Sequence, residues 1–139
     1  LLAGIAICFD IIFDEQAVAM IDDGAEVILA QTNNADFGRT DENAQQLEIA
    51  RLRAIETGRA VVNISTVGIS EIIGPDGRAI DSIAPYTAGV MVAEVPTFAG
   101  QTPALQWGSS IAALWLSLGA AGVLLSLASV TFRSRDERA

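Results

Sequence analysis

The one cysteine of the chain, Cys8, is followed two residues later by the carboxylate of Asp10. An apolar run beginning near Ile5 leads into this cysteine, which indicates a strand that delivers the thiol to a sharp turn. At such a turn the thiol would attack a carbonyl carbon, and the backbone N–H of Phe9 would donate to the developing oxyanion. The alternative role for Cys8 is that of a small buried apolar side chain at the end of a strand.

The composition excludes several catalytic mechanisms and binding partners. The 139 residues contain no histidine and no lysine, so neither Ser-His-Asp nor Cys-His catalysis is possible within them. A single cysteine forms no internal disulfide, and without histidine it offers no zinc site, so we expect no metal or other cofactor. The net charge of −9 argues against a nucleic-acid partner.

A second polar group follows the next apolar strand, Glu26 to Ala30. Ligands of α/β sheets usually bind at the carboxyl ends of the strands, so the loop after this strand is a candidate substrate site. Its candidate binding residues are Asn33, Asn34, Asp36 and Phe37. The alternative is that these polar residues are turn residues, which satisfy their own backbone.

The elements that would position these groups alternate between strand and helix. A short helix begins at Asp14 and stops at Gly24, and a longer one, capped by Thr40, ends near Gly58. The charges on the longer helix have spacings of three and four, which favour ion pairs on a helix surface: Glu48, Arg51, Arg53, Glu56 and Arg59. Strands are predicted at 60–65, 69–73, 78–83 and 89–95, with a hairpin turn at 74–77, which gives an α/β fold in the order β-α-β-α-β-β-β-β.

The C-terminal part has the composition of a membrane helix. Residues 108–132 are mostly Leu, Ala, Val, Ile, Gly and Ser, and a helix of that length covers roughly 37 Å, enough to cross a hydrocarbon core. Trp107 lies at its entry, and three arginines follow in the tail 133–139. We therefore expect residues 1–98 to form a domain outside the cytoplasm, 99–107 to be a linker, and the C-terminus to be cytoplasmic.

Four stretches in this order resemble the carbon-nitrogen hydrolase, or nitrilase, superfamily, and within it the apolipoprotein N-acyltransferases of the bacterial inner membrane, the actinobacterial members in particular. They are Ile7 to Asp10, Gln31 to Phe37, Ala50 to Arg59, and Gly68 to Gly77. The resemblance implies an α-β-β-α sandwich, of which this chain would be the C-terminal portion, and a Glu-Lys-Cys triad with Cys8 as its cysteine.

In that family the cysteine takes an acyl chain from a phospholipid as a thioester and passes it to the α-amino group of a lipoprotein's diacylglyceryl-cysteine. The resemblance therefore implies a phospholipid donor, a lipoprotein acceptor and a membrane as partners. Asp10 stands where the family usually has glutamate, and Phe9 where many members have tyrosine. The loop at Asp36 departs from the tryptophan that is often found there in the family.

The triad's glutamate and lysine lie upstream of the cysteine in this family, and the chain contains no lysine. We therefore expect these 139 residues to be inactive alone. Two alternatives remain open: an amidase of the same superfamily that hydrolyses a small amide, and a degenerate, non-catalytic chain anchored in a membrane.

Overall fold

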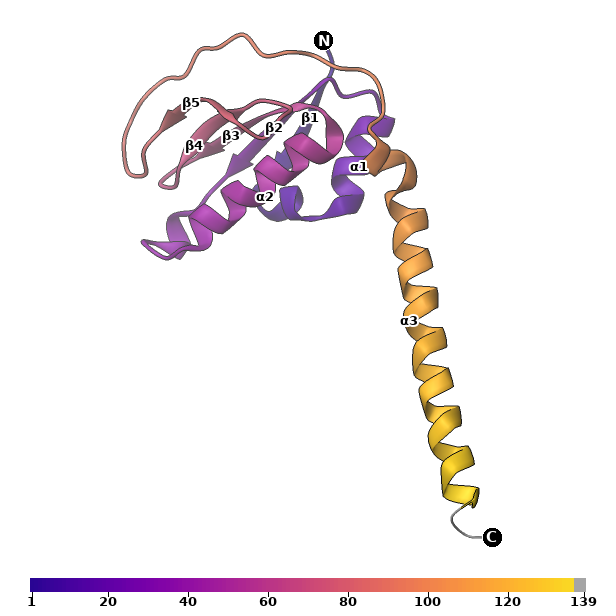
Figure 1. Cartoon of the computed structure of the whole chain (residues 1–139). Coiled ribbons are helices and arrows are strands. Elements are labelled where there is room, and N and C mark those ends of the chain that lie inside the picture. The colour runs from indigo at the N-terminus through magenta and orange to yellow at the C-terminus, as the bar shows by residue number, and fades with distance from the viewer. Residues whose placement is uncertain (137–139) are drawn as a thin grey trace. The chain divides into compact units, whose positions relative to one another are not determined.

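The computed structural model describes residues 1–136, with side chains through Leu127. It divides into two units, Leu1–Leu105 and a second that begins at Gln106. The first unit is an α/β layer, and the second is the greater part of a long helix, so the two are described separately below (Figure 1).

Five strands form one sheet in sequence order. They are β1 (Ala3–Ile7), β2 (Val27–Thr32), β3 (Ala60–Ser65), β4 (Ser70–Ile73) and β5 (Ala79–Ile83). The first three are parallel, whereas β3 to β5 are antiparallel, with the predicted hairpin turn between β4 and β5. Because β1, β2 and β3 run the same way, their carboxyl ends meet at one edge of the sheet.

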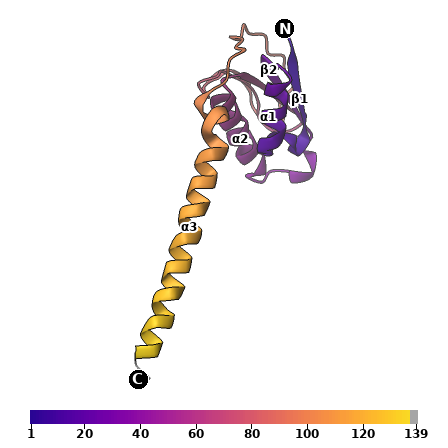
Figure 2. The same ribbon diagram turned by 90° about the vertical axis from the view of Figure 1, so that its right-hand side faces the viewer.

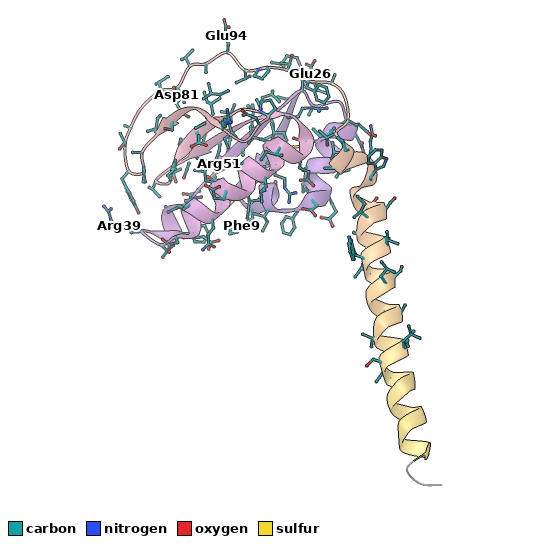
Figure 3. The ribbon with its side chains drawn as sticks, in the orientation of Figure 1. Phe9, Glu26, Arg39, Arg51, Asp81 and Glu94 are labelled. Carbon is teal, nitrogen blue, oxygen red and sulfur yellow. The ribbon has the colours of Figure 1, made fainter. Side chains whose placement is uncertain are left out.

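Two α-helices cover one face of this sheet, α1 (Asp14–Asp22) and α2 (Glu42–Thr57). Gly4 of β1 lies directly beneath Met20 of α1, where an added Cβ would be 2.7 Å from the sulfur. Arg51 of α2, labelled in Figure 3, forms an ion pair with Glu71 of β4 at 2.8 Å. The strand registers place Gly4 and Glu71 on the same face, so both helices pack on it, and Figure 2 shows α1 beside β1.

The opposite face of the sheet is largely exposed over β1. Ile5 and Ile7 are 59% and 63% exposed there, and Ile64 of β3 is 49% exposed. The described residues therefore supply one sheet with helices on one face, which is one α-β half of the expected sandwich.

Two predictions of local structure within the first unit need correction. The predicted strand 89–95 does not form, because this segment pairs with no strand in the part of the chain described and Gly89 instead lies against Ile83 on the sheet face. The cap of α2 is Asp41 and not Thr40, whose hydroxyl donates to the Phe37 carbonyl. Two short 3-10 helices, η1 (Cys8–Ile12) and η2 (Ala35–Phe37), were not predicted.

The last element is α3 (Pro103–Asp136), which begins inside the stretch expected to be a linker. Within its segment Pro103–Leu127 an 18-residue window has a mean hydropathy of 1.9 and none of that window is buried, so by length and composition α3 could span a membrane. In the predicted cytoplasmic tail 133–139, residues 137–139 lie outside the described residues.

Candidate functional site

Cys8 lies where the sheet gives way to a turn. β1 ends at Ile7, and Cys8 begins η1 with a φ of 58°, in the left-handed region that non-glycine residues rarely adopt. Asp10 supports this turn, because its carboxylate accepts the backbone N–H of Ile7 at 3.0 Å. The cysteine is half-buried and free. The sequence thus predicted the strand and the sharp turn at the thiol.

Side chains of α2 also hold this turn. The Gln46 amide donates to the Cys8 carbonyl at 2.9 Å, and the Arg53 guanidinium donates to the carbonyls of Ile11 and Ile12 at 3.0 and 2.8 Å. Gln46 and Arg53 are seven residues apart, so they share one face of the helix two turns apart. Ala50 lies between them and is fully buried, which lets η1 approach the helix closely.

Arg53 is a buried cation, only 7% exposed. Burial lowers the pKa of its guanidinium, but hydrogen bonds and charge attraction from Glu56 and Asp14 together raise that pKa above its ordinary value. These carboxylates also form ion pairs with it. Arg53 therefore stays charged at every physiological pH and links α2, η1 and α1.

Neither Gln46 nor Arg53 was recognised as a site residue from the sequence. The predicted Arg53–Glu56 and Glu48–Arg51 ion pairs are present, but Arg53 itself is buried, which corrects the interpretation of the arginines as helix-surface charges. Arg59 is also buried, at 1% exposure, where it donates to the carbonyls of Ala25 and Thr57, and burial lowers its pKa. The spacing of four and three residues between Gln46, Ala50 and Arg53, which places them on one helix face, was the sequence signal that could have identified both site residues.

A hollow of about 560 Å³ opens at the carboxyl ends of the three parallel strands. Its lining comes from the ends of β1, β2 and β3 and the residues that follow them: Ile7, Cys8, Gln31, Thr32, Asn33, Ile64, Ser65 and Thr66. Cys8 and Asn33, predicted as catalytic and substrate-binding residues, thus face one space, as the topology of parallel strands requires.

The asparagines of the second loop differ in their surroundings. The Asn33 side-chain oxygen accepts the Thr66 hydroxyl at 2.9 Å and the Ala35 backbone N–H at 3.3 Å, as expected of a turn residue. Asn34 is 3% exposed, and its side chain lies near Gly68, where an added Cβ would be 3.2 Å from the Asn34 Nδ2. Asn33 therefore borders the hollow, whereas Asn34 packs inside the protein.

Asp36 and Phe37 belong to η2, outside the lining of the hollow. The Asp36 side chain is exposed. The Phe37 ring meets the Phe9 ring edge to face, with centroids 5.7 Å apart, and Phe9 is labelled in Figure 3. The aromatic pair joins η1 to η2 next to Cys8. Among the described residues, no group of three or more Cys, Asp or Glu side chains could hold a metal ion.

Comparison with known proteins places this geometry in a family. Residues 1–104 match the carbon-nitrogen hydrolase family. The chain is 35% identical over 134 residues to the apolipoprotein N-acyltransferase of Vibrio vulnificus, covering 96% of this chain and 25% of that protein. It is 35% identical over 124 residues to the apolipoprotein N-acyltransferase of Mycolicibacterium smegmatis, covering 89% of this chain and 21% of that protein. The chain thus spans about a quarter of the length of these relatives.

Solved structures share the fold at lower identity. A carbon-nitrogen hydrolase from Helicobacter pylori superposes with a TM-score of 0.59 and 17% identity, covering 84% of this chain and 44% of that one. A mutant of the amidase from Nesterenkonia sp. AN1, with acrylamide added to its active-site cysteine, gives a TM-score of 0.50 and 23% identity, covering 60% and 35% of the two chains. With the family match over three quarters of its length and this shared fold, the chain belongs to the carbon-nitrogen hydrolase family.

Proposed function

We propose that this chain carries the nucleophile of an apolipoprotein N-acyltransferase, a membrane enzyme that acylates the N-terminus of lipoproteins. The observation that carries the proposal is the match of nearly the whole chain to proteins of that name, together with a helix that could span a membrane. A membrane helix suits an enzyme whose acyl donor lies in a bilayer, whereas hydrolysis of a small soluble amide has no need of one.

In the first step the Cys8 thiolate attacks an ester carbonyl of a phospholipid. A carbon–sulfur bond forms, the ester carbon–oxygen bond breaks, and the lysophospholipid leaves with the proton given up by the thiol. The oxyanion formed on the way would meet the Phe9 backbone N–H, which lies in the first turn of η1, where helices leave N–H groups without an internal partner. The Phe9 and Phe37 rings offer apolar surface to the acyl chain.

In the second step the α-amino group of a diacylglyceryl-cysteine attacks the thioester. An amide bond forms, the carbon–sulfur bond breaks, and the sulfur recovers a proton. Asp10 acts in this scheme by fixing the turn through the Ile7 N–H, and Asn33, at the rim of the hollow, is placed to contact the substrate. Asn34 and Asp36 would shape the loop around it.

The scheme requires a base and a cation that make the thiol a good nucleophile. The resemblance assigns these roles to a glutamate and a lysine, and these 139 residues contain no lysine. We therefore propose that the chain is inactive by itself and acts with a segment that supplies both groups. We further propose that α3 crosses the membrane with its arginine-rich end in the cytoplasm and the sheet on the other side.

The test uses the full gene product, purified in detergent, with phospholipid as donor. Intact-protein mass spectrometry should show an adduct of fatty-acyl mass that hydroxylamine removes, and Cys8→Ser should lose that hydroxylamine-sensitive adduct. If no adduct forms and small amides are hydrolysed in a manner that depends on Cys8, the chain belongs to an amidase instead. If neither occurs, Cys8 is structural and the proposal is wrong.

A further inference from the structure

The hydrogen bond from Gln46 joins two parts of the chain that are far apart in sequence. Its amide nitrogen donates to the backbone carbonyl of Cys8 at 2.9 Å, across 38 residues of sequence. Gln46 is 4% exposed, so the donor side of this part-buried contact is shielded from water. The acceptor of this bond, Cys8, has a positive φ, which among the described non-glycine residues only Tyr86 shares.

A left-handed φ at a non-glycine residue has to be maintained by its surroundings. The conformation brings Cβ close to a carbonyl oxygen, so a free cysteine in a loop would relax to a right-handed or extended backbone. Rotating the backbone at Cys8 would turn its carbonyl as well. A donor fixed on a helix and aimed at that carbonyl therefore opposes the relaxation.

Gln46 is poorly suited to a role in stability alone. Its other amide atom, Oε1, is buried and has no hydrogen-bond partner among the described residues. A buried amide with one half unpaired contributes less to folding than an apolar side chain of similar size would, because the unpaired acceptor keeps its desolvation cost. Gln46 also does not line the hollow beside Cys8, so it has no direct path to a substrate there.

We propose that Gln46 is the positioning residue of the nucleophile: its amide holds the Cys8 carbonyl, keeps the cysteine backbone left-handed, and so directs the thiol toward the hollow. This inference deepens the proposed acyl transfer and rests on it. Arg53 fixes the far end of η1 through the Ile11 and Ile12 carbonyls, whereas Gln46 acts at the cysteine itself.

The test compares Gln46→Met with Gln45→Met in the full gene product in detergent. Met keeps the length of the glutamine side chain and removes its donor, and Gln45 is the exposed neighbour of the same residue type. We expect single-turnover thioester formation at saturating phospholipid to slow about five- to tenfold in Gln46→Met, as the loss of one hydrogen bond predicts. The phospholipid concentration for half-maximal rate should stay unchanged, and Gln45→Met should behave as wild type.

A role in folding alone would lower the yield or melting temperature of Gln46→Met without slowing the folded enzyme. If Gln46→Met does not fold, Gln46→Leu serves in its place, because leucine also has no donor and suits a buried position. An unchanged rate of thioester formation, or a change only in the half-saturating phospholipid concentration, would overturn the assignment.

A second measurement separates this inference from the proposed function. Iodoacetamide alkylates a thiol without any acyl donor, and peptide mapping reports the rate at Cys8 itself. We expect Gln46→Met to slow this alkylation severalfold, since the relaxed turn directs the thiol away from the hollow. If wild type forms no thioester, the proposed function fails, yet slower alkylation of Gln46→Met still supports the role of Gln46, and an unchanged or faster rate refutes it.

Discussion

The turns that follow β1 and β2 lie at the same edge of the sheet, and both contain a 3-10 helix, yet they are held in different ways. η1, which begins with Cys8, is held by side chains of α2 that lie 38 to 42 residues away. The loop that contains η2 is held mostly by near neighbours, such as the bond from the Ala35 N–H to Asn33 and that from Thr40 to Phe37.

The difference fits the task proposed for each turn. A nucleophile needs one fixed direction, which tertiary contacts to a packed helix can provide. A loop that receives substrates of varied chain can rely on local hydrogen bonds, which leave it free to adjust. The comparison therefore predicts that substitutions far from Cys8 in sequence disturb η1 more than substitutions within the second loop disturb that loop.

The largest effect is expected at Arg53. Arg53→Met removes the donors to the Ile11 and Ile12 carbonyls and leaves Glu56 without its partner, which should cost about 2–3 kcal/mol of unfolding free energy. Thermal denaturation in detergent would measure it. Arg78→Met is the matched control, since the Arg78 side chain is 88% exposed and its ion pair with Asp76 should contribute almost nothing. Equal melting temperatures for the two variants would contradict the claim that long-range contacts from α2 hold η1.

A middle effect is expected from the backbone of Cys8. Because its φ is 58°, Cys8→Gly should be more stable than Cys8→Ala by about 1 kcal/mol, although glycine destabilises most other positions. Denaturation of the two variants side by side gives this difference directly. Should alanine prove the more stable, Cys8 would not be held in a left-handed conformation.

The smallest effect is expected in the second loop. Asn33→Ala removes the acceptor for the Thr66 hydroxyl and the Ala35 N–H, both exposed, so the loss of stability should be about 0.5–1 kcal/mol. We expect the transfer step, followed with a diacylglyceryl-cysteine peptide, to slow more than thioester formation. A loss of stability as large as that of Arg53→Met would show that both turns are held with similar strength.

The sequence predicted most of the layer, because its strands and helices carry regular apolar patterns with clear caps and turns. It placed Cys8 at a strand end and Asn33 at the same sheet edge, which follows from parallel strands alone. It did not predict the burial of Arg53 or the contact from Gln46, since both depend on which face of α2 meets η1. Residues 89–95 are rich in valine, which is typical of strands, but a strand needs a partner edge, and local pattern cannot supply one.

The central claim is that Cys8 carries the acyl group between two substrates. The most direct measurement loads the full gene product with a labelled phospholipid acyl chain, maps the label by peptide analysis, and then adds a diacylglyceryl-cysteine peptide. The account predicts label on Cys8 that moves to the α-amino group of the added peptide. Label on another residue, or label on Cys8 that is released only to water, would contradict it.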